Sequence, residues 1–97
     1  MTKISPIYYE VMIYNPMRGN ITLYRGVDET ACLMAIKRGF STENVSFVEL
    51  RMQRAEVSPT GEYVPDTRFK QSVVMLGSGN IGDINLDKLI SNYDAIH

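Results

Sequence analysis

The stretch of residues 7–40 constrains the fold more than any other part of this chain. Over residues 7–14 every second side chain belongs to one wholly apolar face, and a period of two predicts a half-buried β-strand. Its apolar face, which we place on the core, consists of Ile7, Tyr9, Val11 and Ile13. Turn-forming residues follow at 15–20, in the order NPMRGN, and predict a return strand over 21–25. The chain is therefore expected to begin with an antiparallel hairpin.

A helix is predicted directly after this hairpin. Asp28 is expected to cap its start, and Glu29 adds negative charge where the helix dipole favours it. Gly39 is expected in the left-handed conformation that commonly ends a helix. The predicted buried stripe consists of Ala31, Met34, Ala35 and Ile36. The N-cap, the apolar stripe and the glycine at the end all indicate a helix, so this segment is predicted as the first helix of the fold.

The second half of the chain predicts one long hairpin over residues 45–76. Its first strand covers 45–54, and its return strand covers 68–76. Ser58-Pro59-Thr60-Gly61 has Pro and Gly where a type I turn accepts them. The outer part, about residues 55–67, is expected to project beyond the sheet. Pro65 has no N–H to donate, so a bulge or bend is expected there.

A last helix is predicted from Leu86 to about Ala95, with Asn85 as its cap. The expected element order is ββαββα. This order predicts an α+β fold, a four-stranded antiparallel sheet with the helices packed on one face. Residues 1–97 are expected to form a single domain, since a chain of this length supports one modest core.

Composition limits the classes of function. The chain has 10 basic and 11 acidic residues, a net charge of −1, which argues against a general nucleic-acid coat. A single cysteine excludes an intrachain disulfide and favours a reducing cytoplasm. The N-terminal stretch contains no apolar run long enough for a signal peptide or a membrane span, so neither secretion nor a membrane partner is expected.

Three features could carry chemistry, and none predicts a catalytic, cofactor-binding or metal-binding site. Residues 77–82, GSGNIG, match the spacing of a dinucleotide-binding loop. The chain ends too soon after them for a βαβ unit, so a strand-to-helix turn is expected. His97 is the last residue and lacks the fixed partner that a catalytic base needs. Cys32 lies near a helix start, one residue off the predicted buried stripe, and has no histidine base, so a small apolar residue at or near the helix–sheet contact is expected.

Four of the tyrosines crowd the first hairpin. Core and rim packing is the preferred interpretation, because a stacking platform for single-stranded nucleic acid needs a basic surround that this chain lacks. Tyrosine side chains combine apolar area with a polar tip, which suits a contact surface. The outward-facing candidates for such contacts are Tyr8, Tyr14 and Tyr24.

The charged residues support two opposite hypotheses about a binding surface. A basic set lies along the second hairpin and predicts a small nucleic-acid-binding regulator; it consists of Arg51, Arg54, Arg68 and Lys70. An acidic set could imitate spaced phosphates and engage the basic groove of a partner. The candidate partner-binding residues of this second hypothesis are Asp28, Glu29, Glu43, Glu56, Glu62 and Asp66.

Two runs of residues carry a resemblance to a known family. They are YYEVMIYNPMRGNITLYRG, residues 8–26, and DETACLMAIKRG, residues 28–39. With them the chain resembles small anti-CRISPR proteins of phages and other mobile elements, similar to inhibitors of the type I-F surveillance (Csy) complex. The resemblance implies a non-enzymatic inhibitor in the cytoplasm of the bacterial host. Its partner would be the CRISPR-Cas complex of protein subunits and crRNA, with no direct nucleic-acid, membrane, small-molecule or cofactor binding. Inhibition would come from occupying the PAM-recognition site or imitating duplex DNA there.

Overall fold

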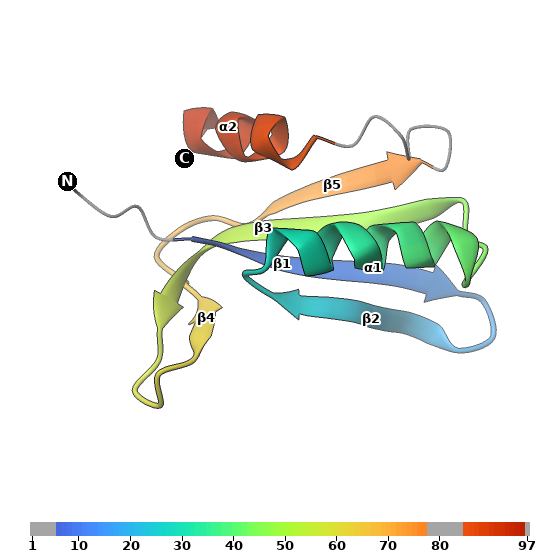
Figure 1. Ribbon diagram of the computed structural model, residues 1–97, viewed down its shortest axis with the longest axis horizontal. Helices are drawn as coiled ribbons and strands as arrows, with labels where there is room; N and C mark the ends of the chain where they lie inside the picture. The colour runs from blue at the N-terminus through green and yellow to red at the C-terminus, as the bar shows by residue number, and fades with distance from the viewer. Residues whose placement is uncertain (1–5, 78–84, 97) are drawn as a thin grey trace.

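The computed structural model describes residues 6–77 and 85–96, and its elements follow the order ββαβββα (Figure 1). Residues 78–82 of the glycine-rich stretch and His97 lie outside the described residues. The elements are β1 (Ile7–Asn15), β2 (Gly19–Gly26), α1 (Glu29–Ser41), β3 (Phe47–Val57), β4 (Tyr63–Pro65), β5 (Ser72–Gly77) and α2 (Leu86–Ile96). In this described part, no helix combines the length and the apolar character that crossing a membrane requires.

The strands form an antiparallel sheet in the order β2-β1-β3, with β4 and β5 both paired to β3. The predicted α+β class is confirmed, but the predicted order ββαββα is wrong because the return arm of the second hairpin is split. Ala55 pairs with Pro65, whereas Met52 pairs with Ser72, so the returning chain uses four more residues than β3 between these pairs. The extra residues follow Pro65, which cannot donate to the ladder.

Both helices contribute to one core on the same face of the sheet. The predicted apolar face of β1 is confirmed, and it packs beside Val48, Leu50 and Met52 of β3. Cys32 and Ile36 of α1 are fully buried against this face, and Leu86 and Tyr93 of α2 complete the cluster. Figure 1 shows α1 laid across the strands and α2 alongside β5. The opposite face of the sheet is therefore left open.

The buried stripe of α1 differs from the predicted one. It consists of Cys32, Ala35, Ile36 and Gly39, the spacing of one face of an α-helix. Met34 is 66% exposed, so its predicted burial is wrong. Cys32, predicted one residue off the buried stripe, is fully buried in it, and its expected place at the helix–sheet contact is confirmed. Gly39 is not the left-handed end of the helix, because α1 continues to Ser41 and Thr42 is its C-cap.

A β-bulge in the first hairpin corrects the prediction for Tyr24. Val11 pairs with Tyr24 and Met12 pairs with Thr22, so Leu23 is an extra residue on β2. The bulge turns Leu23 and Tyr24 toward the core, where both pack against the buried cluster. Tyr24 is therefore not an outward contact residue. Its hydroxyl instead accepts a hydrogen bond from the N–H of Asp28 at 2.9 Å.

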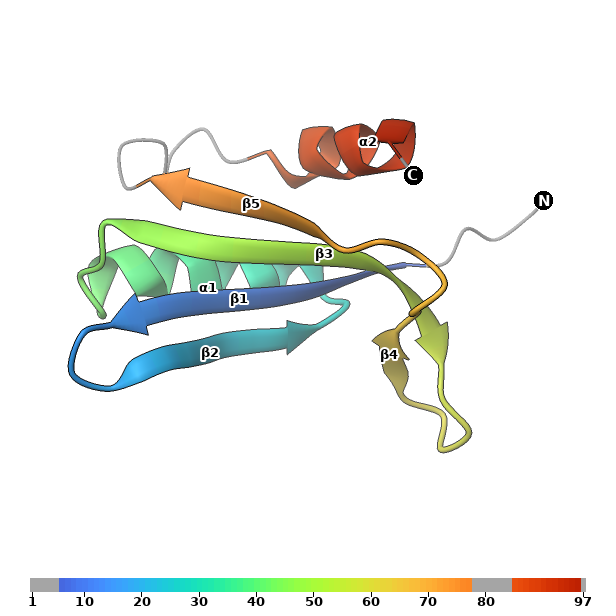
Figure 2. The same ribbon diagram turned by 180° about the vertical axis from the view of Figure 1, so that it is seen from behind.

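The end of β3 and β4 form a hairpin that projects from the body of the sheet, which confirms the predicted projection (Figures 1 and 2). We call residues 55–65 the arm. The predicted turn closes it, since the N–H of Gly61 donates to the carbonyl of Ser58 at 2.9 Å. Gly61 has a φ of +89°, which glycine adopts without a Cβ clash.

Candidate functional site

The face of the sheet turned away from the helices carries large apolar side chains. In Figure 2, which shows this face, α1 lies behind the strands. We call it the open face. Four of its side chains are between 51% and 64% exposed; they are Tyr14, Phe47, Val73 and Met75. Exposed apolar side chains gathered on one surface are typical of an interaction site.

Four charges at the centre of the open face neutralise one another. Glu10 lies between Arg25, at 2.7 Å, and Arg51, at 3.6 Å, on neighbouring strands. Glu49 accepts a 2.6 Å hydrogen bond from Nε of Arg51. Opposite charges facing each other across strands stabilise the sheet. The open face is therefore electrically balanced, with two carboxylates and two guanidinium groups.

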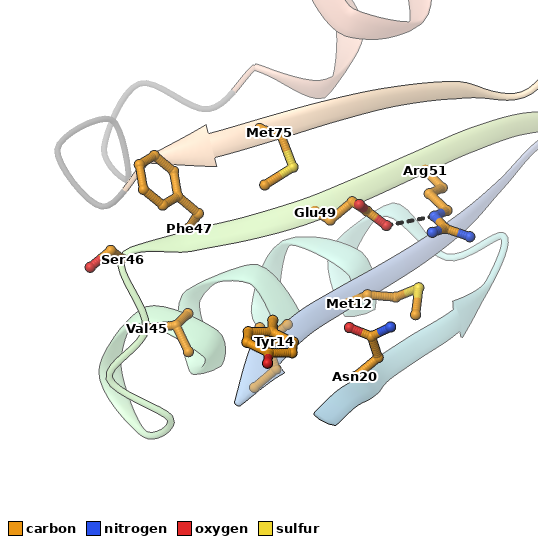
Figure 3. A pocket seen from close by; sticks show the side chains of 10 residues that line it. Met12, Tyr14, Asn20, Val45, Ser46, Phe47, Glu49, Arg51 and Met75 are labelled. Atoms are coloured by element: carbon orange, nitrogen blue, oxygen red, sulfur yellow. Dashed lines mark hydrogen bonds and ion pairs between the residues drawn. The ribbon is translucent and has the colours of Figure 1, made fainter. Parts of the chain in front are cut away.

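A hollow of about 380 Å³ opens on this face at the end of β1. It forms where β1 and β3 stop pairing, since their register ends at Met12 and Glu49. Tyr14 stands on one side of the hollow, and Phe47 and Met75 stand on the other (Figure 3). Its charged lining residues, Glu49 and Arg51, are bound to each other. The hollow therefore combines an aromatic and apolar rim with neutral polar side chains, Asn20 and Ser46.

The arm is a second surface with a different character. Its described apolar side chains include Val57 and Tyr63, which are exposed and paired across the two strands. Residues 55–65 contain two acidic residues, Glu56 and Glu62, and no basic one. The arm therefore presents apolar area together with negative charge.

A buried carboxylate holds the base of the arm. Asp66 is only 3% exposed, and its carboxylate accepts hydrogen bonds from the backbone N–H of Arg68 at 3.0 Å and from its Nε at 2.9 Å. The hydrogen bonds from the Arg68 side chain hold the pKa of the Asp66 carboxyl below its usual value. Gln53 donates to the carbonyls of Asp66 and Phe69, at 2.8 and 2.9 Å. These bonds fix where the arm leaves the sheet.

The six predicted acidic contact residues fall into two groups. Glu56, Glu62 and Asp66 belong to the arm and its base, and the N-terminal end of α1, with Asp28 and Glu29, lies at the same end of the molecule (Figures 1 and 2). The C-terminal end of α1, which Glu43 follows, lies at the opposite end. The fold thus brings five of the six to one end.

Two of these carboxylates have structural roles. The predicted cap is confirmed, because Oδ1 of Asp28 accepts a hydrogen bond from the N–H of Ala31 at 3.1 Å. Asp66 is buried beneath the exposed side chain of Arg68, so little of the Asp66 carboxylate is left for a partner. The exposed carboxylates of the arm are the more accessible candidates: Glu62, and Glu56, whose carboxylate lies 3.8 Å from the guanidinium of Arg68.

Three members of the basic set of the second hairpin are ion-paired. Arg51 pairs with Glu10 and Glu49. The exposed Arg68 pairs with Asp66 and, at 3.8 Å, with Glu56 of the arm. Arg54 pairs with Asp94 of α2. Nucleic-acid affinity depends on cations that can replace counterions at phosphates. These ion pairs do not favour the hypothesis of a nucleic-acid-binding regulator.

Cys32 is held in its protonated form. Burial, with a smaller contribution from Glu29, raises the pKa of its thiol to about 12, so the helix N-terminus does not activate it. Burial also raises the pKa of Tyr9, whose hydroxyl lies 3.5 Å from Oε1 of Glu29. Across residues 6–77 and 85–96, no group of three or more His, Cys, Asp and Glu side chains could hold a metal ion.

The predicted outward position of Tyr14 is confirmed, but sequence reasoning missed the other apolar residues of the open face. The signal was present, because the outward positions of these strands carry large apolar residues: Phe47 on β3, and Val73 and Met75 on β5. Comparison with protein-family models, with curated proteins and with solved structures found no match to this chain. The architecture itself defines the class, a small α+β protein with an open-faced antiparallel sheet.

Proposed function

We propose that this protein is a non-enzymatic inhibitor of the crRNA-guided type I-F (Csy) surveillance complex, and that it prevents the complex from engaging target DNA. The choice of partner is supported by the resemblance carried by residues 8–26 and 28–39. The protonated, buried state of Cys32 supports a binding function rather than nucleophilic chemistry. The site of action is the cytoplasm of the bacterial host.

The observation that carries the proposal is the projecting acidic arm. A complex that reads duplex DNA uses Lys and Arg against phosphates and bases. Carboxylates form strong, charge-assisted hydrogen bonds with the same cations. Glu62 provides such a group on a segment that extends away from the body. Glu56 provides a second one, because its pair with Arg68 is exposed and a partner's cation can replace it. Val57 and Tyr63 add apolar area beside them. The arm therefore suits a basic groove.

The position of the arm adds a second argument. Asp28 and Glu29 lie at the same end of the molecule as the arm, so carboxylates from two elements can contact one basic surface (Figure 1). A local pattern of charge is sufficient for this, since electrostatic complementarity acts at the contact and does not require a large net charge. We place the PAM-recognition site of the complex against this end.

The test is a competition between the protein and PAM-containing duplex DNA for purified type I-F complex. The expected result is that protein added first abolishes the mobility shift of the duplex. The double variant Glu56→Gln, Glu62→Gln is expected to weaken inhibition at least about tenfold, since charge pairs of this kind contribute on the order of 1–3 kcal/mol each.

A matched control changes the net charge by the same amount at the other end of the molecule. Ser41→Lys with Thr42→Lys raises the net charge by two, as the removal of two carboxylates does, at exposed positions in the last turn of α1 and its C-cap. This variant is expected to inhibit as the wild-type chain does. Failure of the wild-type chain to bind the complex contradicts the proposal. Simultaneous binding of protein and duplex contradicts the DNA-mimicry mechanism.

A further inference from the structure

We propose that the open face of the sheet forms a two-fold symmetric interface with a second copy of this chain. The inference does not depend on the proposed inhibitory function. The face presents Tyr14, Phe47, Val73 and Met75 in the open, on the strands β1, β3 and β5. Face-to-face packing of two such sheets, about 10 Å apart, buries the apolar side chains of both copies.

The charges of the open face favour a second copy over a charged partner. Glu10, Glu49, Arg25 and Arg51 already neutralise one another, so a partner needs no excess charge of either sign. In a two-fold interface each surface meets itself, and an unbalanced patch would meet its own charge. Arg25, Glu10 and Arg51 alternate across β2, β1 and β3, which allows opposite charges of two copies to meet.

The shape of the open face is also suited to self-association. Its hollow of about 380 Å³ lies directly beside two exposed aromatic side chains, Tyr14 and Phe47 (Figure 3). Binding energy at protein interfaces concentrates where aromatic side chains enter well-packed pockets. A two-fold axis places the aromatic rim of each copy over the hollow of the other. The second copy then fills the hollow and also covers the protruding side chains of Tyr14 and Phe47.

The dimer leaves the other candidate surface accessible. The arm extends away from the sheet, and α1 covers the opposite face (Figures 1 and 2). Each dimer would therefore present two arms. Because the arms are not part of the contact, changes at Glu56 and Glu62 are expected to leave the dimer intact, which separates this inference experimentally from the proposed function.

The experiment measures the mass of the full chain by sedimentation equilibrium, from about 1 µM to about 300 µM, the range in which weak and moderate interfaces dissociate. We expect the mass to rise from one chain of 11.0 kDa to two. Phe47→Lys and Met75→Lys, made separately, are each expected to raise the dissociation constant at least about tenfold, the effect of a charge placed in an apolar contact.

Matched controls place the same lysine on other surfaces. Met17→Lys, in the exposed turn between β1 and β2, and Met34→Lys, on the outer side of α1, are expected to dimerise as the wild-type chain does. Circular dichroism verifies that each variant is folded. A wild-type chain that stays monomeric throughout overturns the inference. A dimer that withstands Phe47→Lys and Met75→Lys but dissociates with Met34→Lys overturns it as well.

A second measurement applies even if a lysine variant fails to fold. Cys32 is the only cysteine and is fully buried, so Met75→Cys introduces a single accessible thiol on the open face. A short bis-maleimide is expected to link two chains of this variant. Met34→Cys is expected to give mainly singly modified monomer. Equal crosslinking of both variants overturns the inference.

Discussion

A Cβ atom at Gly39 of α1 would lie 2.9 Å from Cγ2 of Val48 in β3. The methyl groups of Ile13 and Leu23 would each be 3.3 Å from the same atom. Val48 is fully buried, and its β-branched side chain has little freedom to move aside. The backbone of α1 therefore approaches the sheet at this point more closely than a side chain allows.

Gly39→Ala is accordingly expected to lower the free energy of unfolding by about 1 kcal/mol. Overpacking a core costs about 1–3 kcal/mol, and the better helix propensity of alanine offsets up to about 1 kcal/mol of that. Urea denaturation measures the difference. Thr30→Ala, at an exposed position of the same helix, serves as the control and is expected to change stability by less than about 0.5 kcal/mol. A Gly39→Ala variant that is more stable than the wild-type chain contradicts the close approach.

Tyr93→Phe is expected to weaken the attachment of α2. The buried hydroxyl of Tyr93 donates to the carbonyl of Lys70 at 2.9 Å and accepts from the N–H of Arg54 at 3.2 Å. Removing it withdraws a partner from both backbone groups, at a cost of about 1–3 kcal/mol. Denaturation gives the loss of stability, and amide exchange of α2 is expected to accelerate. Tyr63→Phe, on the exposed arm, should have no comparable effect.

Asp28 allows the capping role of a carboxylate to be separated from its charge. Asn caps a helix about as well as Asp, whereas Ala does not, so Asp28→Asn is expected to keep the stability and Asp28→Ala to lose about 1 kcal/mol. Thermal or urea unfolding distinguishes the two variants. If the carboxylate also contacts the surveillance complex, both substitutions weaken inhibition. Full inhibition by Asp28→Asn would assign Asp28 to the cap alone.

The stability contributed by Asp66 is expected to depend on pH. Hydrogen bonds from Arg68 lower the pKa of its carboxyl in the folded chain. A lowered pKa stabilises the fold above the unfolded value of about 3.9, and the contribution is lost as pH falls through the folded value. The difference in free energy of unfolding between the wild-type chain and Asp66→Asn should be constant from about pH 7 to 5 and narrow below about pH 4. Glu62→Gln, in the exposed turn of the arm, is the control, and equal pH dependence of both variants refutes the role of Asp66.

Cys32 is expected to resist alkylation in the folded chain. Burial raises the pKa of its thiol to about 12, so the reactive thiolate is scarce at pH 8 and iodoacetamide should react only in denaturant. The raised pKa stabilises the fold below the unfolded value of about 8.5, and this contribution declines as pH rises above it. Cys32→Ala should therefore lose less stability than the wild-type chain between pH 8.5 and about 11. Rapid alkylation of the native chain would contradict the buried position.

Several elements follow directly from local sequence. The alternation from Ile7 to Ile13 fixes both the strand and its buried face, because successive side chains point to opposite sides. Asp28 caps the helix through a contact only three residues away, and Ser58 to Gly61 closes a turn within four. These features depend on neighbours in the chain, so the residue types are sufficient to predict them.

Other features depend on partners distant in the sequence, and only the tertiary structure decided them. The bulge at Leu23 is set by the register with β1, and it turns Tyr24 inward. Gly39 is required by the close approach to Val48 and not by the end of the helix. The face of α1 that contains Gly39 packs on the sheet, so Cys32 lies in the core and Met34 is exposed. Asp66 is buried because Arg68 and the split of the return arm enclose it. The sequence by itself determined the periods, caps and turns, whereas the packing of remote segments decided which side chains are buried and which remain available for a partner.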